Sequence, residues 1–148
     1  MHRRFIDPLT DFGFKRLFGS EPNLDLLLDF LNAILPPANR IRSLTLRRTE
    51  YAGKHAEDRK AFIDVYCVGE NGERFIVEVQ RLWQNNFVDR CMYYSTFSIQ
   101  EQAKRGSWDF ELTPVYVVGI LDFMFPDRVA EGEYFHIVEM KDQLGRVF

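Results

Sequence analysis

The segment 62–80, FIDVYCVGENGERFIVEVQ, constrains the fold more than any other part of the chain. Two runs rich in β-branched and aromatic residues flank a polar turn at 70–72, which is the pattern of a β-hairpin. Three polar residues, Asp64, Glu78 and Gln80, interrupt these runs. The register of the hairpin therefore decides whether these three side chains lie on one face of the sheet.

Two turn lengths give two registers for this hairpin. A two-residue turn centred on Asn71 and Gly72 places Asp64 and Glu78 on opposite faces, because side chains alternate along a strand. A three-residue loop at 70–72, with Gly72 in the left-handed conformation of a G1 bulge, places the two carboxylates directly opposite each other.

The distribution of apolar residues favours the three-residue loop. In that register one face is wholly apolar and pairs Ile63 with Val79, Val65 with Val77, and Cys67 with Phe75. The other face pairs Phe62 with Gln80, Asp64 with Glu78, and Tyr66 with Ile76. An ordinary solvent-facing strand pair is the alternative interpretation, but bulky hydrophobic neighbours are unusual on a solvated face.

The opposed carboxylates of Asp64 and Glu78 indicate a metal site. Two like charges directly across an antiparallel pair repel each other unless positive charge lies between them. Mg²⁺ prefers hard oxygen ligands and keeps several waters, so it is the simplest candidate cation. Gln80, two residues beyond Glu78 on the same face, could orient a water for in-line attack on a phosphodiester. The predicted chemistry is therefore metal-dependent phosphodiester hydrolysis.

Length and composition fit one globular domain at 1–148, because 148 residues with 46% hydrophobic content can bury a core. No apolar run approaches the roughly 18 residues of a membrane helix, and no signal peptide is visible. Two cysteines without a CxxC spacing favour the reducing cytoplasm. The polar, turn-like sequence at 141–145 suggests the N-terminal part of a longer protein.

Other chemistries lack their motifs. The three histidines have no metal-ligand spacing, and no GxSxG, GxGxxG or Walker motif is present, so no organic cofactor is expected. The net charge of −3 hides a basic N-terminal part: residues 1–60 hold 11 Lys and Arg against 8 Asp and Glu. This part could follow phosphates or form a solvated charged surface. Trp83, Trp108 and the six tyrosines are interpreted as core or rim residues.

Periodicity and cap residues predict the remaining elements. The expected helices lie at 11–19, 20–35 and 85–106, and the expected strands at 41–50, 62–69, 74–80, 115–121 and 135–140, with a loop at 51–57. Thr10 or Asp11 is the expected N-cap of the first helix. Strand 115–121 is expected to be covered on both faces. The resulting α-α-β-β-β-α-β-β order predicts an α/β fold with a mixed central β-sheet flanked by helices.

Three motifs in the sequence resemble those of a known protein family. They are Asp11-x-x-Phe14-Lys15-x-x-Phe18-Gly19 near the N-terminus, Phe-Ile-Asp64-Val on one strand, and Val-Glu78-Val-Gln80 on the next. With the expected element order, the chain resembles the PD-(D/E)XK nuclease superfamily over about residues 5 to 142. It is most similar to the bacterial PD-(D/E)XK nuclease family transposases, also called recombination-promoting nucleases.

The resemblance implies a restriction-endonuclease-like core and a DNA endonuclease associated with transposition or recombination. It implies Mg²⁺, with Mn²⁺ as a substitute, held by Asp64 and Glu78. Gln80 stands where the superfamily has Lys, although Glu-x-Gln is familiar in this branch. A lysine supplies positive charge at the phosphate and Gln does not, so more stabilisation must come from the metal. The alternative is a non-catalytic nucleic-acid-binding or assembly module that retains the nuclease fold.

The resemblance also suggests roles for two helices. Asp11 and Lys15 lie one helical turn apart, so Asp11 is a candidate metal ligand and Lys15 a candidate catalytic residue, or an N-cap and a surface residue. Arg90 and Tyr94 resemble the family's Arg and Tyr on the third helix and are candidate substrate-binding residues. Arg90 could bind a phosphate bidentately, or could neutralise the carboxylate pair. A homodimer is expected, because cutting both DNA strands needs two sites.

Overall fold

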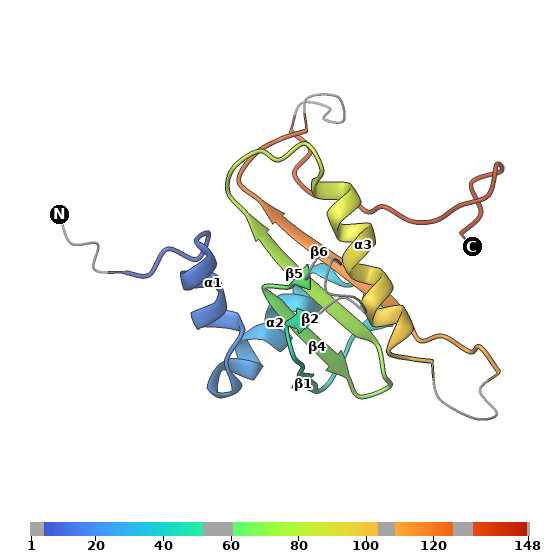
Figure 1. Cartoon of the computed structure of the whole chain (residues 1–148), viewed down its shortest axis with the longest axis horizontal. Helices are drawn as coiled ribbons and strands as arrows, with labels where there is room; N and C mark the ends of the chain where they lie inside the picture. The colour runs from blue at the N-terminus through green and yellow to red at the C-terminus, as the bar shows by residue number, and fades with distance from the viewer. Residues whose placement is uncertain (1–4, 52–60, 104–108, 126–131, 148) are drawn as a thin grey trace.

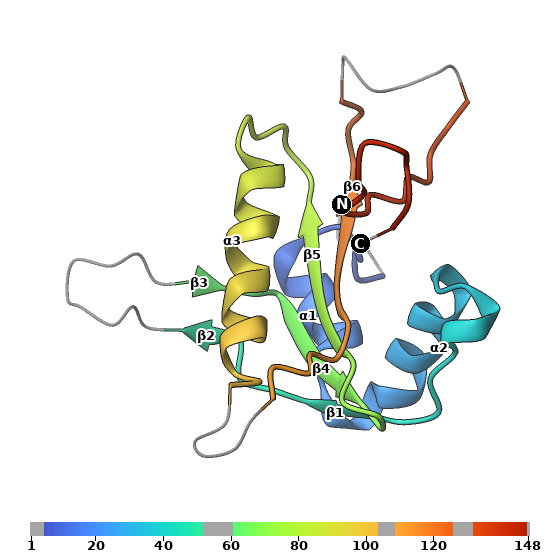
Figure 2. The ribbon, with the colours of Figure 1, turned by 90° about the vertical axis from the view of Figure 1, so that its right-hand side faces the viewer.

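Helices lie against both faces of a four-stranded mixed sheet, as Figures 1 and 2 show. The computed structural model describes residues 5–51, 61–103, 109–125 and 132–147. The helices are α1 (Asp11–Phe18), α2 (Leu24–Ile34) and α3 (Phe87–Gln100), with 3-10 turns η1 (Glu21–Asn23) and η2 (Pro37–Asn39). The strands are β1 (Leu44–Leu46), β2 (Glu50–Tyr51), β3 (Ala61–Phe62), β4 (Val65–Gly69), β5 (Arg74–Gln80) and β6 (Val115–Leu121).

The main sheet has the strand order β1-β4-β5-β6, and β2 pairs with β3 in a separate two-stranded ribbon. β4 is antiparallel to both β1 and β5, whereas β6 is parallel to β5. Parallel neighbours need a crossover connection, and α3 provides it between β5 and β6. The predicted mixed sheet flanked by helices is confirmed.

The hairpin register is the one predicted from the three-residue loop. β4 and β5 pair Val65 with Val77, Tyr66 with Ile76, and Cys67 with Phe75. Gly72 has a φ of 90°, which is the left-handed conformation that a G1 bulge requires. The Gly69 N–H donates to the Glu73 carbonyl at 2.8 Å and closes the loop at 70–72.

The predicted ladder is wrong beyond Val65, because the chain bends at 63–64 and residues 61–62 pair with β2 instead. The predicted ladder pairs of Asp64 with Glu78, Ile63 with Val79, and Phe62 with Gln80 do not form. The physical reason is a side chain: the Val79 N–H donates to the Asp64 carboxylate rather than to a main-chain carbonyl of the neighbouring strand. Ile63 consequently packs on the opposite face from the one predicted.

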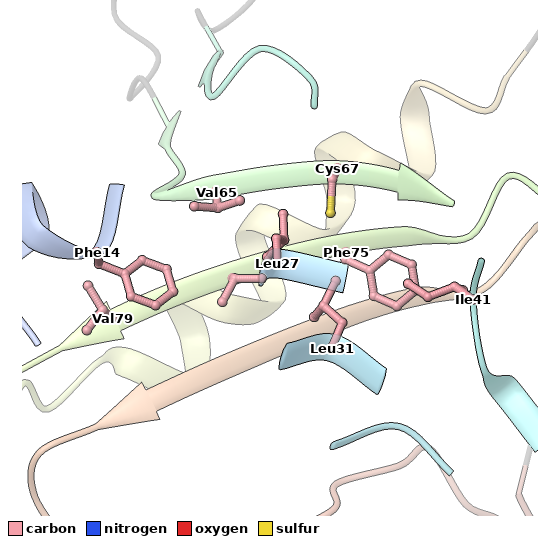
Figure 3. Close-up of a cluster of buried hydrophobic side chains, with 9 residues drawn as sticks. Phe14, Leu27, Leu31, Ile41, Val65, Cys67, Phe75 and Val79 are labelled. Atoms are coloured by element: carbon pink, nitrogen blue, oxygen red, sulfur yellow. The ribbon is translucent and has the colours of Figure 1, made fainter. Parts of the chain in front are cut away.

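Two hydrophobic clusters hold the layers together. On the α1 and α2 side, a cluster of buried side chains joins the helices to the sheet: Phe14, Leu27, Leu31, Ile41, Val65, Cys67, Phe75, Val77 and Val79 (Figure 3). On the α3 side, Ile63, Tyr66 and Ile76 form a smaller cluster against which Tyr94 packs. Each face of β4 and β5 is thus covered, as the alternation of their side chains requires.

The N-terminal helix is positioned by a cap and a glycine. The Gly13 N–H donates to Thr10 Oγ1 at 3.1 Å, so Thr10 is the N-cap and Asp11 lies in the first turn. A side chain at Gly13 has no room, because a Cβ atom there would lie 1.9 Å from the Asp7 carbonyl oxygen. In the helix so placed, Phe14 is buried in the core and Lys15 lies on the side that faces Asp64, just before the start of β4.

Several predicted boundaries are wrong. η1 takes up the start of the second helix, so α2 begins at Leu24, and the first predicted strand is reduced to β1 and β2. α3 ends at Gln100 with Glu101 as its C-cap, whereas the predicted stop at Gly106 lies outside the described residues, as does most of the predicted loop at 51–57. β6 has the predicted bounds, but as the edge strand it is only partly buried.

The strand predicted at 135–140 is absent. Its hydrophobic side chains are exposed, and in the described residues the only pairing near it is a single bridge between Lys141 and Val147. The alternating sequence fits a strand, but a strand forms only where a neighbour offers its backbone groups. Among the helices that the structure describes, none is both long and apolar enough to cross a bilayer.

Candidate active site

Asp64 and Glu78 are held together by reciprocal hydrogen bonds at the start of β4. The Asp64 backbone N–H donates to Glu78 Oε1 at 3.2 Å, and the Val79 backbone N–H donates to Asp64 Oδ2 at 2.9 Å. Each carboxylate is thereby oriented by the main chain of the neighbouring strand. One oxygen of each side chain is occupied in this way, which leaves Asp64 Oδ1 and Glu78 Oε2 for other partners.

Burial makes this pair electrostatically costly. Glu78 is 3% exposed, and burial, followed by the negative charge of Asp64, raises its pKa to about 7. Burial also raises the pKa of Asp64, against the opposing effect of the Val79 N–H and of Lys15. Two neighbouring carboxylates whose pKa values are both raised by burial favour binding a proton or a cation.

Two basic side chains flank the carboxylates from opposite helices. Lys15 of α1 places its Nζ 3.2 Å from Asp64 Oδ1 and 2.6 Å from Asp11 Oδ1. Arg90 of α3 places Nη2 3.7 Å from Glu78 Oε2. The free oxygen of each carboxylate therefore faces a cation, Lys15 on one side and Arg90 on the other.

Gln80 is tied to Arg90. Its Oε1 accepts a hydrogen bond from Arg90 Nη2 at 2.9 Å, and its Nε2 donates to the Leu82 carbonyl at 2.9 Å. Arg90 Nη1 also donates to Gln84 Oε1 at 2.5 Å, and the guanidinium lies 5.3 Å from the centre of the Phe87 ring. The guanidinium is consequently held beside Glu78 by Gln80 at the end of β5, by Gln84 in the connection and by Phe87 at the start of α3.

These residues line one cleft of about 580 Å³. Its walls include every predicted site residue except Lys15, namely Asp11, Asp64, Glu78, Gln80, Arg90 and Tyr94. Lys15 reaches the same place through its ion pair with Asp64. Tyr94 packs against the Ile63 cluster, and burial and the charge of Glu78 raise its pKa. Seven residues predicted from separate parts of the sequence are thus gathered at one site.

The cleft fits a hard divalent cation with two protein ligands. Within the described ranges, no three acidic, histidine or cysteine side chains come together as a metal-binding group. Asp11 therefore does not form a three-ligand cluster with Asp64 and Glu78, and its carboxylate pairs with Lys15. Mg²⁺ is commonly held by one or two carboxylates together with water and substrate phosphates, so the two remaining oxygens match its chemistry.

Sequence reasoning did not predict the cleft positions of Gln84 and Trp83. Both line the cleft, and Gln84 holds Arg90 in place. The only available signal was their position, three and four residues beyond Gln80, where the chain leaves the end of a strand that carries site residues. Ends of strands in α/β sheets commonly lie at binding crevices.

Comparison with known proteins identifies the family and agrees with the fold. A family model described as PD-(D/E)XK nuclease family transposase matches residues 8–148, which include both carboxylates and both flanking basic residues. Searches of curated proteins and of solved structures each gave no match. The mixed sheet with helices on both faces is the restriction-endonuclease-like arrangement of this superfamily. The chain belongs to the PD-(D/E)XK nuclease family transposases.

Proposed function

We propose that this nuclease-family protein is a Mg²⁺-dependent DNA endonuclease that acts in transposition or recombination, with Asp64 and Glu78 as its metal ligands. The observation that carries the proposal is the reciprocal anchoring of the two carboxylates, which directs Asp64 Oδ1 and Glu78 Oε2 away from their backbone partners. The raised pKa of Glu78, to about 7, adds that the pair lacks sufficient positive charge of its own.

Bound Mg²⁺ would supply a coordinated water of lowered pKa and would offset the negative charge of the phosphate. Mn²⁺, another cation that accepts carboxylate oxygens, is the expected substitute. Lys15 and Arg90 are already within ion-pair distance of the carboxylates, so either can move its charge to a phosphate placed in the cleft. Tyr94 lines the same cleft and is proposed to contact the substrate.

The position of Arg90 supports the proposal that the site is active without a lysine at position 80. Its guanidinium lies 2.9 Å from the Gln80 amide oxygen, so positive charge from α3 reaches the place where the superfamily has Lys. Gln80 is accordingly proposed to position Arg90 as well as to accept a hydrogen bond from water. A homodimer would bring two such sites to the two strands of a duplex.

The test is a nicking assay on supercoiled plasmid in Mg²⁺ and in chelator. Glu78→Gln and Asp64→Asn each remove a charge and keep an oxygen for the backbone N–H that orients the wild-type side chain. Both variants are expected to lose nicking, whereas Asp29→Asn, an exposed carboxylate on α2 outside the cleft, is expected to retain it. Nicking that survives in Glu78→Gln would show that the activity does not belong to this site.

The second candidate is a non-catalytic nucleic-acid-binding or assembly module. The observation that favours it is the pairing of both free carboxylate oxygens with Lys15 and Arg90, which gives the pair partners without any metal. A titration separates the two functions, because a ligand that binds only the folded state raises the melting temperature. An increase with Mg²⁺ or Mn²⁺ that disappears in Asp64→Asn supports a metal site. A flat titration favours the module.

A further inference from the structure

An exposed tryptophan lies on the wall of the cleft. Trp83 lines the same cleft as Asp64 and Glu78, and it is 44% exposed. Its indole Nε1–H donates to Asn85 Oδ1 at 2.7 Å, which satisfies its one polar group and fixes the orientation of the ring. The rest of the indole is apolar, and the side chain is partly exposed in the cleft that Asp64 and Glu78 also line.

Two phenylalanines make T-shaped contacts with this ring. Phe123 and Phe125, which follow β6, lie 5.2 and 5.4 Å from the Trp83 ring at interplanar angles of 76° and 72°. These edge-to-face contacts differ from the stacked arrangement in which one ring covers the face of another. The segments after the parallel strands β5 and β6 thus build an aromatic support in which neither phenylalanine stacks face to face on the indole. We call Trp83, Phe123 and Phe125 the aromatic platform.

The rest of the cleft supplies the groups that a nucleotide needs. Arg90 provides a cation near the carboxylates, and Arg81, two residues before Trp83, is a second, half-exposed cation in the wall that also pairs with Asp7 at 3.3 Å. A second exposed aromatic residue, Phe62, is 57% exposed and lines the cleft as well. A nucleic-acid strand offers anionic phosphates, which cations bind, and flat bases, on which aromatic rings stack. The cleft presents cations and exposed rings together.

We propose that the aromatic platform stacks on an unpaired nucleobase beside the phosphate held in the cleft, so that the substrate class is single-stranded or locally unpaired DNA. This inference rests on the proposed nuclease function and adds its substrate class. In a duplex both faces of a base are covered by its neighbours, so an indole can stack on a base only where the strand is single or the base is displaced. Stacking on a ring is tolerant of sequence, because every base has a flat face.

The first experiment measures binding without cleavage. Fluorescence anisotropy compares a labelled single-stranded oligonucleotide with the matching duplex, once in Ca²⁺ and once in chelator. The wild-type chain is expected to prefer the single strand, and Trp83→Ala is expected to weaken that binding by roughly tenfold while leaving duplex binding unchanged. Trp83→Phe keeps a ring and should restore most of the affinity. Met124→Ala, an exposed apolar residue between the two phenylalanines, is the matched control and should bind as wild type.

The second experiment reports on the ring itself. The chain has two tryptophans, so Trp108→Phe leaves Trp83 as the single tryptophan, whose emission is excited selectively at wavelengths that tyrosine does not absorb. Stacking on a base is expected to quench this emission when single-stranded DNA is added, and to protect it from acrylamide. An oligonucleotide that lacks one base should no longer quench the Trp83 emission when the abasic position lies where that base would stack on the indole.

The outcomes separate the two proposals. Quenching and Trp83-dependent binding without plasmid nicking support the platform and count against the nuclease activity. Nicking with no dependence on Trp83, no quench and equal binding of single and double strands supports the nuclease and overturns the platform. Quenching that grows with protein concentration in the absence of DNA also overturns it, because a second copy of the chain then covers the indole.

Discussion

Arg90 Nη2 lies 2.9 Å from Gln80 Oε1, so the guanidinium on α3 brings positive charge to the neutral side chain at position 80. Gln80→Lys would place two cations within hydrogen-bond distance of each other. We therefore expect Gln80→Lys and Arg90→Gln each to lower the rate of plasmid nicking. The double variant, which moves the positive charge from position 90 to position 80, should recover more activity than the product of the single effects allows. Additive losses in this double-mutant cycle would mean that the two residues act independently.

The raised pKa of Glu78 predicts how metal-free stability depends on pH. Between the ordinary pKa of 4.5 and the folded value of about 7, the folded state binds a proton that the unfolded state has released, so stability falls as pH rises. The loss is on the order of 3 kcal/mol across that window. Chemical denaturation from pH 5 to pH 8 in chelator measures it.

Glu78→Gln should remove most of this slope and should be more stable than wild type above pH 7. Asp29→Asn, exposed on α2, should keep the slope. Metal binding needs the ionised carboxylate, so the increase in melting temperature caused by Mg²⁺ should be larger at pH 8 than at pH 6. A wild-type stability that does not fall over this range would contradict the burial of Glu78 as the source of the shift.

Truncation of two phenylalanines of α1 should have very different effects on the free energy of unfolding. Phe14 is buried against Val79 and the α2 side chains (Figure 3). Its ring lies 4.9 Å from that of Phe18. Phe14→Ala is expected to lower the free energy of unfolding by about 3–5 kcal/mol, because it leaves a cavity in the core. Phe12 is 73% exposed, so Phe12→Ala should change that free energy by no more than about 0.5 kcal/mol. Urea denaturation of both variants decides the matter.

A carboxylate at the end of α3 should act as a structural clamp. Glu101 accepts hydrogen bonds from the hydroxyl groups of Tyr51 at 2.8 Å and Tyr66 at 2.6 Å, and Tyr66 is fully buried. Glu101→Ala leaves that buried hydroxyl without this acceptor, so we expect a loss of about 1–3 kcal/mol of stability. Adding Tyr66→Phe to Glu101→Ala should cost less than Tyr66→Phe alone. Equal costs in the two backgrounds would show that the hydrogen bond contributes nothing.

Local pattern was sufficient where one interaction decides the structure. Gly72 fixes the loop because few other residues adopt its backbone conformation, and the alternation of apolar residues then fixes the pairing of Val65 with Val77. The same logic brought Asp64 and Glu78 together. The predicted pairing failed before Val65, because no pattern rule anticipates a carboxylate that accepts a main-chain N–H of the next strand.

Tertiary context decided what remained. The segment 135–140 alternates as a strand does, yet it finds no partner in the described part of the chain. The hydrogen bond between Gln80 and Arg90 joins a strand to a helix ten residues later, and neither residue type announces it. The position of Trp83 likewise depends on its contacts with Phe123 and Phe125, which follow β6. Local periodicity does not predict such contacts between distant segments.

The hydrogen bond from the Val79 N–H to Asp64 gives this acidic residue a structural role that does not depend on any reaction. A descendant of the chain that no longer cut DNA would still need an acceptor at that spot to end the hairpin, and selection for folding alone would preserve it. Retention of the acidic pair in a homologous sequence therefore counts as evidence for the shape of the hairpin before it counts as evidence for turnover.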